Sequence, residues 1–125
     1  MFEIVALILL SQQPVLPVAE GMASYYTVES SSTLTASGEQ MNDDLLTCAM
    51  LNGEFGSHYL VVAENGRSVV CRLNDRGPYV KGRVIDLSKA AMRRLDPRGS
   101  LDRGVIRVKV YPLGKRRGRR APSLN

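Results

Sequence analysis

The sequence predicts a small, mainly β-stranded domain built as a barrel, with one short helix. Short runs of apolar and β-branched residues recur along the chain and alternate with turn residues, as in small barrels. One helical segment, 88–95, begins at a serine that can cap it and ends at Asp96-Pro97. The length of 125 residues allows one hydrophobic core and is too small for two domains.

The expected strands follow from local patterns taken in chain order. They are 22–27, 45–50, 58–63, 68–73, 83–87 and 104–111. In the last of them Arg107 and Lys109 alternate with Val108 and Val110, which is the two-residue period of a half-buried strand. Residues 29–40 are rich in Ser, Thr and Gly, so we expect a loop there.

The strands 58–63 and 68–73 are expected to form a hairpin. Between them stands Glu64-Asn65-Gly66-Arg67, and an Asn-Gly pair tolerates the positive φ that tight hairpins require. The two strands should therefore be antiparallel neighbours in the barrel.

The net charge of +5 is concentrated at the C-terminus. The five charges lie within six residues, on Lys115, Arg116, Arg117, Arg119 and Arg120, which leaves 12 of the 17 basic residues to balance the 12 acidic ones. We expect 114–125 to be a basic disordered tail that attracts polyanions through charge. No aromatic residue is interleaved with these charges, so specific recognition of nucleic acid is not expected.

The N-terminal residues 1–21 resemble a secretory signal. Ile4 to Leu10 form an apolar run that is too short to span a bilayer as a helix, so no transmembrane span is expected. On this interpretation the protein is periplasmic or secreted, and without a lipid anchor because no cysteine precedes Cys48. Glu3 is acidic, whereas the residues before the apolar run of a signal are usually basic. A hydrophobic first strand therefore stays open as the alternative.

Two cysteines, Cys48 and Cys71, both lie in apolar, strand-like surroundings. Paired in an oxidising compartment, they would close a loop over 49–70 and stabilise the domain by roughly 3 kcal/mol. Two inert buried thiols are the alternative. With a single histidine elsewhere, this spacing matches no common zinc pattern, so no metal site is expected.

A polar corner follows the strand 68–73, where Asn74-Asp75-Arg76 precedes Gly77-Pro78. Asp75 thus stands where a strand opens into a loop, a position at which catalytic and binding groups concentrate. A simple turn is the alternative, because Asp and Asn side chains also bond nearby backbone N–H groups.

Several short sequence blocks, the polar corner among them, follow one another along the chain in a particular order and spacing. They are Ala23-Ser24-Tyr25-Tyr26, Thr35-Ala36-Ser37-Gly38-Glu39, Leu46-Thr47-Cys48-Ala49, Phe55-Gly56-Ser57, 65–70, 74–79 and 84–91. Together they resemble the rare lipoprotein A domain family over about residues 22–113. The resemblance implies a six-stranded double-psi β-barrel with one or two short helices, a fold shared with expansins and barwin-like proteins.

The resemblance also implies a lytic transglycosylase that acts on peptidoglycan glycan strands without a cofactor. Such an enzyme cleaves the β-1,4 bond after N-acetylmuramic acid without water, because the sugar's own 6-hydroxyl attacks C1. One carboxyl group can serve first as the acid and then as the base. Asp75 matches that carboxyl group, and Glu39 matches a second acid that orients substrate or tunes Asp75.

Other residues of the matched blocks are expected around these two acids. Asp86 matches the aspartate of the family's Ile-Asp-Leu-Ser block, where we expect it to bond loop N–H groups or Arg76. Tyr25, Tyr26 and Tyr79 offer flat apolar faces suited to sugar rings, although packing roles are equally open.

One departure from the family pattern bears on activity. Family enzymes usually have histidine where this chain has Met50, and a thioether cannot transfer a proton at neutral pH. If Cys48 and Cys71 pair, strand parity brings position 50 towards Leu73 and Asp75, so Met50 still belongs to the expected site. Two functions stay open: a monomeric transglycosylase that works without the histidine, and a non-catalytic, expansin-like glycan-binding barrel.

Overall fold

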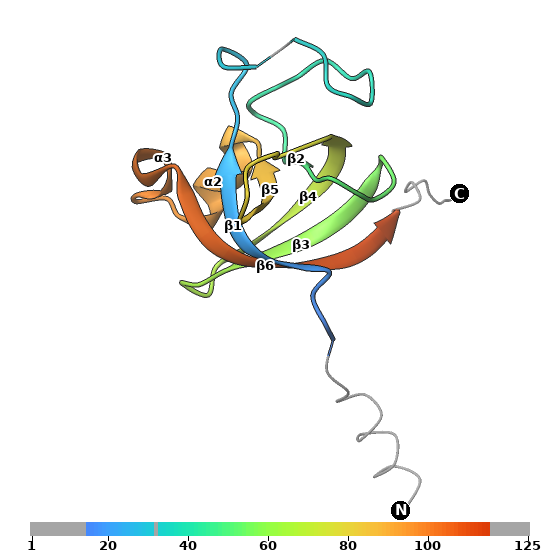
Figure 1. Ribbon diagram of the computed structural model, residues 1–125. Coiled ribbons are helices and arrows are strands. Elements are labelled where there is room, and N and C mark those ends of the chain that lie inside the picture. Colours follow the sequence, from blue (N-terminus) through green and yellow to red (C-terminus); the bar gives the residue numbers. More distant parts are fainter. Residues whose placement is uncertain (1–14, 32, 116–125) are drawn as a thin grey trace, which may run out of the picture.

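The computed structural model of the protein describes residues 15–31 and 33–115 (Figure 1). Most of the expected signal segment and the tail residues 116–125 lie outside the described residues. The signal segment and the polyanion-binding tail therefore stay predictions.

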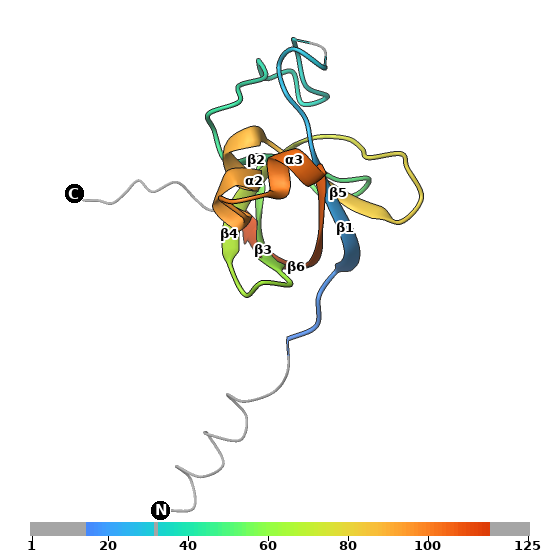
Figure 2. The same cartoon turned by 90° about the vertical axis from the view of Figure 1, so that its left-hand side faces the viewer.

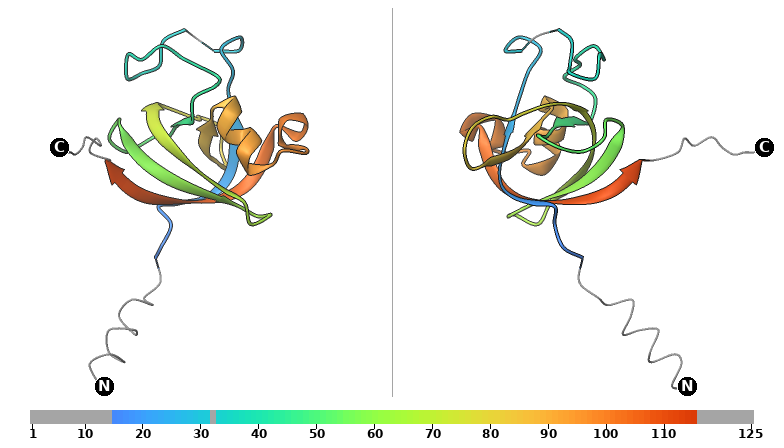
Figure 3. Two further views of the ribbon diagram at one scale, coloured as in Figure 1. Left: turned by 180° about the vertical axis from the view of Figure 1, so that it is seen from behind. Right: turned by 45° about the vertical axis from the view of Figure 1, so that its right-hand side comes forward.

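Six strands form a closed barrel in the order β1-β5-β2-β4-β3-β6, which confirms the expected double-psi fold. The pairs β1–β5 and β2–β4 are parallel, and the other neighbours are antiparallel. The strands are β1 (Ala19–Tyr25), β2 (Thr47–Ala49), β3 (Ser57–Ala63), β4 (Ser68–Asp75), β5 (Arg83–Leu87) and β6 (Val105–Lys115). Figure 3 shows the long β6 curving past β3 and closing the barrel against β1.

Two short helices, α2 (Lys89–Leu95) and α3 (Ser100–Arg103), lie together on one side of the barrel (Figure 2). Ser88 caps α2 as expected, since its Oγ accepts a hydrogen bond from the Ala91 N–H at 3.2 Å. Neither helix is long or apolar enough to cross a membrane, and the same holds for any helix in the described part of the chain.

The ends of the barrel strands extend further than the sequence pattern indicates. β1 begins at Ala19. β6 continues to Lys115, and near its end Gly114 pairs with His58 of β3. Lys115, assigned above to the tail, thus belongs to the barrel, and its Nζ bonds Glu54 at 3.2 Å. Strict alternation ends near Tyr111, so the sequence gives no signal for the last pairs.

The β3–β4 hairpin is confirmed, but its turn differs in detail. The Gly66 N–H donates to the Ala63 carbonyl at 2.9 Å, and the Ala63 N–H donates to the Arg67 carbonyl at 2.8 Å. Gly66 has φ of 88°, whereas Asn65 is not in the positive-φ region. This is a three-residue loop with one left-handed glycine, the usual second choice for a tight hairpin.

The core fills the barrel and includes the disulfide. Leu73, Ile85 and Leu87 are fully buried, as are Met92 and Leu95 of α2. Cys48 and Cys71 form the expected disulfide between β2 and β4, with Cα atoms 5.8 Å apart and no exposed surface. The bridge fixes β2 against β4, and the candidate site lies where both strands end.

Candidate functional site

Four residues form one row across four neighbouring strands. Ser24 lies opposite Asp86, Asp86 lies opposite Ala49, and Ala49 lies opposite Asp75. Residues directly opposite in paired strands point to the same face of a sheet. In the adjacent row Leu87, Cys48 and Leu73 are fully buried in the core. The two aspartates therefore stand on the outer face of the barrel with Ala49 between them.

A register shift puts Asp75 in this row. On β4, Leu73 lies opposite Cys48 and Asp75 lies opposite Ala49, so β4 advances two residues where β2 advances one. Strand parity, as used above, takes Leu73 and Asp75 to share one face of β4, and this does not hold because the irregularity reverses the side on which Asp75 points.

The Asp75 side chain is held from one side. Its Oδ1 accepts the N–H of Ala36 at 2.8 Å and the N–H of Arg76 at 2.9 Å. The loop that contains Ala36 is fixed to the strand end by a further bond, from the Ser37 N–H to the Asn74 carbonyl at 3.1 Å. Oδ2 of Asp75 has no hydrogen bond within residues 15–31 and 33–115, so it is the oxygen that can meet a substrate.

Asp86 is a partly buried carboxyl group of the row. Its Oδ1 accepts a hydrogen bond from Ser24 Oγ at 3.0 Å. Burial raises the pKa of Asp86 above its ordinary value, and the charge of Asp75 adds to this, while Ser24 and Arg83 oppose it. Asp86 is thus more easily protonated than an ordinary aspartate.

Arg76 does not bond Asp86, contrary to one of the sequence-based expectations. Its guanidinium donates to the carbonyls of Gly53 at 2.7 Å and Met50 at 3.4 Å, and it lies 4.2 Å from the ring centroid of Phe55. Arg76 therefore fastens the segment after β2 to the end of β4.

The Glu39 carboxylate is held by hydrogen bonds from two side chains of β4, next to the row. Arg72 donates to both of its oxygens, at 2.6 and 3.1 Å, and Asn74 Nδ2 donates at 2.7 Å. The hydrogen bonds from Arg72 hold the pKa of Glu39 below its ordinary value, and Asn74 contributes in the same direction. Glu39 is consequently a fixed negative charge, and it has no direct bond to Asp75.

The three expected sugar-binding tyrosines lie in different environments. Tyr26 is buried and shares a hydrogen bond of 2.7 Å with Thr47 Oγ1, and burial raises its pKa to about 12, with a further contribution from the charges of Asp75 and Asp86. Tyr25 donates to the Leu101 carbonyl at 3.0 Å, so its hydroxyl points to α3. Tyr79 is 79% exposed on the loop after Asp75.

Met50 adjoins Asp75 through the main chain. Its N–H donates to the Asp75 carbonyl at 3.3 Å, which fits the expected proximity of position 50 to the site. Its side chain is buried with the core residues and lines a cavity of about 400 Å³ together with Tyr59 and Val84. The thioether therefore packs in the core next to the strand end.

The sequence model of a family described as lytic transglycolase matches residues 18–110. The chain belongs to the lytic transglycolase family. Within the described residues, no group of three or more His, Cys, Asp or Glu side chains could hold a metal ion.

Curated relatives extend this lytic transglycolase assignment. The chain is 44% identical over 97 residues to "Endolytic peptidoglycan transglycosylase RlpA" of Pasteurella multocida, covering 77% of this chain and 33% of that protein. It is 40% identical over 99 residues to the protein of the same name from Yersinia pestis, covering 78% and 28%. The chain thus spans about a third of the length of these relatives.

Solved structures agree with the lytic transglycolase fold. The Streptomyces papain inhibitor has a TM-score of 0.60 at 24% identity, covering 82% of this chain and all of that chain. A Clavibacter michiganensis expansin in complex with cellohexaose has a TM-score of 0.61 at 19% identity, covering 80% and 52%. Both show a shared fold.

Two members of the candidate site were not expected from the sequence. Arg72 stands two residues before Asn74 on β4, so a face shared by two polar residues was the available signal. Ser24 precedes two tyrosines in the first matched block, but nothing in the sequence pairs it with Asp86 across the parallel β1–β5 contact.

Proposed function

We propose that the protein is a peptidoglycan lytic transglycosylase, with Asp75 and Asp86 as its reacting carboxyl groups. The observation that carries this proposal is the row in which both aspartates flank Ala49 on the outer face of the barrel. Two strand spacings of about 4.8 Å place their Cα atoms roughly 10 Å apart, which leaves room for a glycosidic bond between the side chains. The relatives named as peptidoglycan transglycosylases support the same reaction.

The reaction needs an acid and a base at different oxygens. The 6-hydroxyl oxygen of the N-acetylmuramic acid unit attacks C1 and gives its proton to Oδ2 of Asp75. The bond from C1 to the glycosidic oxygen breaks, its electron pair stays on that oxygen, and the oxygen takes a proton from Asp86. The products are a 1,6-anhydro end and a free 4-hydroxyl, so no water is consumed.

The environments of the two aspartates suit these roles. The raised pKa of Asp86 favours the protonated form that a general acid needs. Two backbone N–H groups orient Asp75 through Oδ1, and Oδ2 stays available as the base. This division replaces the single-carboxyl scheme, in which Asp75 serves as both acid and base.

Glu39 has a positioning role in this proposal. Its lowered pKa makes it unsuitable as a proton donor, but its bonds to Arg72 and Asn74 hold the loop that supplies the Ala36 N–H to Asp75. Because Asp86 supplies the proton, the scheme requires no proton transfer at position 50, where the family usually has histidine.

Cleavage assays on purified glycan strands test the proposal. Wild-type protein is incubated with peptide-free and intact peptidoglycan, and 1,6-anhydro ends are measured by mass spectrometry. Asp75→Asn and Asp86→Asn should each lose at least about a hundredfold in rate. Asp102→Asn removes an exposed carboxylate on α3 and should retain full activity.

Two outcomes of this assay would contradict the proposal. Cleavage only after Met50→His would show that the histidine is required. Binding of glycan without cleavage by any variant would favour the expansin-like binding barrel instead.

We extend the proposal to the cellular setting. The domain would act as a monomer on glycan strands in the cell envelope, as a periplasmic or secreted protein, and the tail from Arg116 would add contact with polyanions. Fractionation of cells that express the full chain, with and without residues 116–125, tests the location and the tail together.

A further inference from the structure

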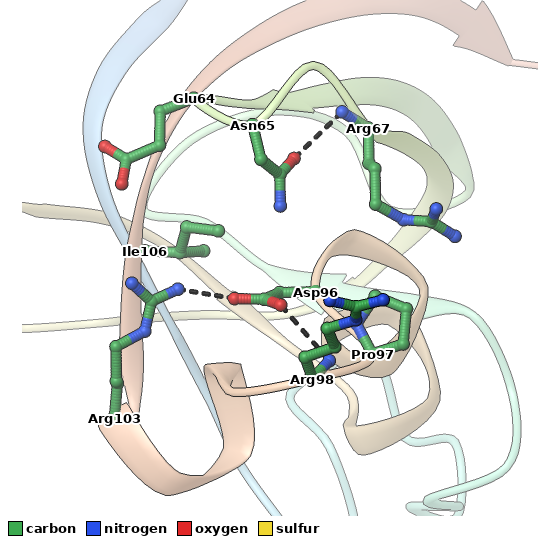
Figure 4. A pocket seen from close by; sticks show the side chains of 8 residues that line it. All are labelled: Glu64, Asn65, Arg67, Asp96, Pro97, Arg98, Arg103 and Ile106. Atoms are coloured by element: carbon green, nitrogen blue, oxygen red, sulfur yellow. Dashed lines mark hydrogen bonds and ion pairs between the residues drawn. The ribbon is translucent and has the colours of Figure 1, made fainter.

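A separate cavity of about 480 Å³ lies beside the β3–β4 turn, between that turn and the linker from α2 to α3 (Figure 4). Its lining includes Asn65, Arg67, Arg98 and Arg103, together with the two acids Glu64 and Asp96. β4 begins just after Arg67 and ends at Asp75, so eight steps of about 3.3 Å separate the two residues by roughly 25 Å along the strand. The cavity is therefore distinct from the carboxylate row.

Of the two acids that line this cavity, Asp96 is already neutralised. Asp96 accepts the N–H groups of Arg98 at 3.2 Å and Gly99 at 3.3 Å, and it forms an ion pair of 2.5 Å with Arg103. These bonds appear as dashed lines around Asp96 in Figure 4 where both partners are drawn. Asp96 thus holds the linker and Arg103 in place, and its charge does not compensate the other arginines.

Two further guanidinium groups at the cavity have no acidic ion-pair partner among the residues that the structure describes: those of Arg67 and Arg98. Arg67 is fixed by a hydrogen bond from its Nε to the Arg94 carbonyl at 3.0 Å. Its turn is tied to the end of α2, because Asn65 Nδ2 donates to the Leu95 carbonyl at 2.9 Å. Arg67 and its turn are therefore held in place before any ligand binds.

The two segments around the cavity carry more basic than acidic residues, and every basic residue in them is an arginine. The segments 64–67 and 93–107 carry six arginines against three acids: Arg67, Arg93, Arg94, Arg98, Arg103 and Arg107 against Glu64, Asp96 and Asp102. Arginine presents a planar set of donors that pairs with two oxygens of one oxyanion, which lysine cannot do.

We infer that this arginine pocket, formed by Arg67, Arg98 and Arg103 around Asp96, binds a phosphate group of an anionic polymer or lipid headgroup. A tetrahedral phosphate offers oxygens in several directions, which suits a cavity lined by guanidinium groups from two segments, those of Arg67 and Arg98, that have no acidic ion-pair partner. The cavity volume exceeds that of a bare phosphate and accommodates the alcohol or sugar that carries it. Bound in this way, the domain would be held at one end while the carboxylate row stays free at the other.

Titration of the full chain with inorganic phosphate, followed by backbone NMR shifts, tests the pocket directly. The double variant R67Q/R98Q should lose about tenfold or more in affinity, because two charge-assisted contacts are removed. The matched double variant R93Q/R107Q removes the same charge from exposed arginines that do not line the cavity, and it should change affinity less than about twofold. Both variants keep the basic tail, so its contribution is constant.

Two larger probes then identify the source of the phosphate. Retention on vesicles of phosphatidylglycerol and phosphatidylcholine, lost in R67Q/R98Q, assigns it to a lipid headgroup. Retention on soluble poly(glycerol phosphate) alone assigns it to a polymer. Equal losses in the two double variants, or no saturable shift of pocket residues with inorganic phosphate, would overturn the inference. Asp75→Asn should bind phosphate like the wild type. The phosphate-binding result can therefore be interpreted even if the proposed catalysis fails.

Discussion

Asp75 and Asp86 lie on opposite sides of Ala49 and share its face of the barrel, although β4 and β5 are not neighbours in the barrel. The relationship depends on β2, which is parallel to β4 and antiparallel to β5. The disulfide from Cys48 keeps β2 against β4 next to this row. Two acids on strands that do not pair are thereby placed with one strand between them, where each has different neighbours.

The first prediction concerns the pH dependence of cleavage. If Asp86 is the acid, kcat/KM should fall as pH rises through its raised pKa, because the proton is then lost before reaction. A pH–rate profile measures this limb, and in Asp86→Asn the remaining slow rate should lack it. A wild-type rate that stays constant from acid to neutral pH would count against Asp86 as the acid.

The second prediction is that Glu39 and Asp86 affect stability with opposite dependence on pH. The lowered pKa of Glu39 stabilises the fold above its ordinary value of 4.5, and this contribution is lost as pH falls. The raised pKa of Asp86 stabilises the fold below its ordinary value of 3.8, and this contribution is lost as pH rises through the folded-state value.

Urea unfolding of Glu39→Gln and Asp86→Asn at pH 3 and pH 7 checks these signs. Glu39→Gln should be destabilised at pH 7 by no more than about 1 kcal/mol, since the pair with Arg72 is partly exposed, and should match the wild type more closely at pH 3. Asp86→Asn should be as stable as the wild type or more stable at pH 7. A loss of stability in Asp86→Asn that is larger at pH 7 than at pH 3 would contradict the assignment.

The third prediction concerns Tyr26 at alkaline pH. Its pKa of about 12 in the folded state lies above the ordinary value of 10.0, so its stabilising contribution is lost as pH rises from about 10 to 12. Tyr26→Phe should remove that part of the alkaline loss. At pH 7 it should cost about 1 kcal/mol, because Thr47 loses its buried partner.

Unfolding free energies at pH 7, 10 and 11 measure both effects. Tyr79→Phe is the matched control, because Tyr79 is 79% exposed and should change neither value. An unaltered alkaline slope in Tyr26→Phe would show that Tyr26 ionises as freely in the folded protein as in the unfolded chain.

The places of the strands along the chain, and of Asp75 where a strand opens into a loop, could be predicted from the sequence, because both depend on local signals. Alternation defines β6, the Asn-Gly pair defines the β3–β4 turn, and Gly77-Pro78 ends the strand at the correct corner. The disulfide was also predictable as one of two alternatives, since only Cys48 and Cys71 are available.

The details of the site depend on contacts that no local pattern encodes. The irregularity opposite Cys48 reverses the face of Asp75, and strict two-residue parity cannot anticipate it. The hydrogen bond from Arg72 to Glu39 joins a strand to a loop 33 residues away in sequence, and no local pattern says which acceptor the Arg72 guanidinium meets. The role of Asp86 likewise depends on its burial in the folded state.

The fourth prediction concerns Gly53, whose carbonyl accepts a hydrogen bond from the Arg76 guanidinium. A Cβ at this position would lie 2.5 Å from the Tyr59 hydroxyl and 2.9 Å from a methyl group of Leu73, and the backbone has φ of 105°. Gly38 has a similar φ of 92° with nothing within 4 Å of the added atom. Gly38→Ala should therefore cost about 1 kcal/mol from backbone strain alone.

Gly53→Ala should cost about 2–4 kcal/mol, because the clash with the buried Leu73 adds to the same strain. The difference in unfolding free energy between the two variants isolates the clash. Displacement of this segment would also move the Gly53 carbonyl away from Arg76, so Gly53→Ala should lower kcat at a temperature at which both variants are folded. Equal stability losses in the two variants would show that the segment after β2 shifts without cost, and that Arg76 does not hold it rigidly to the end of β4.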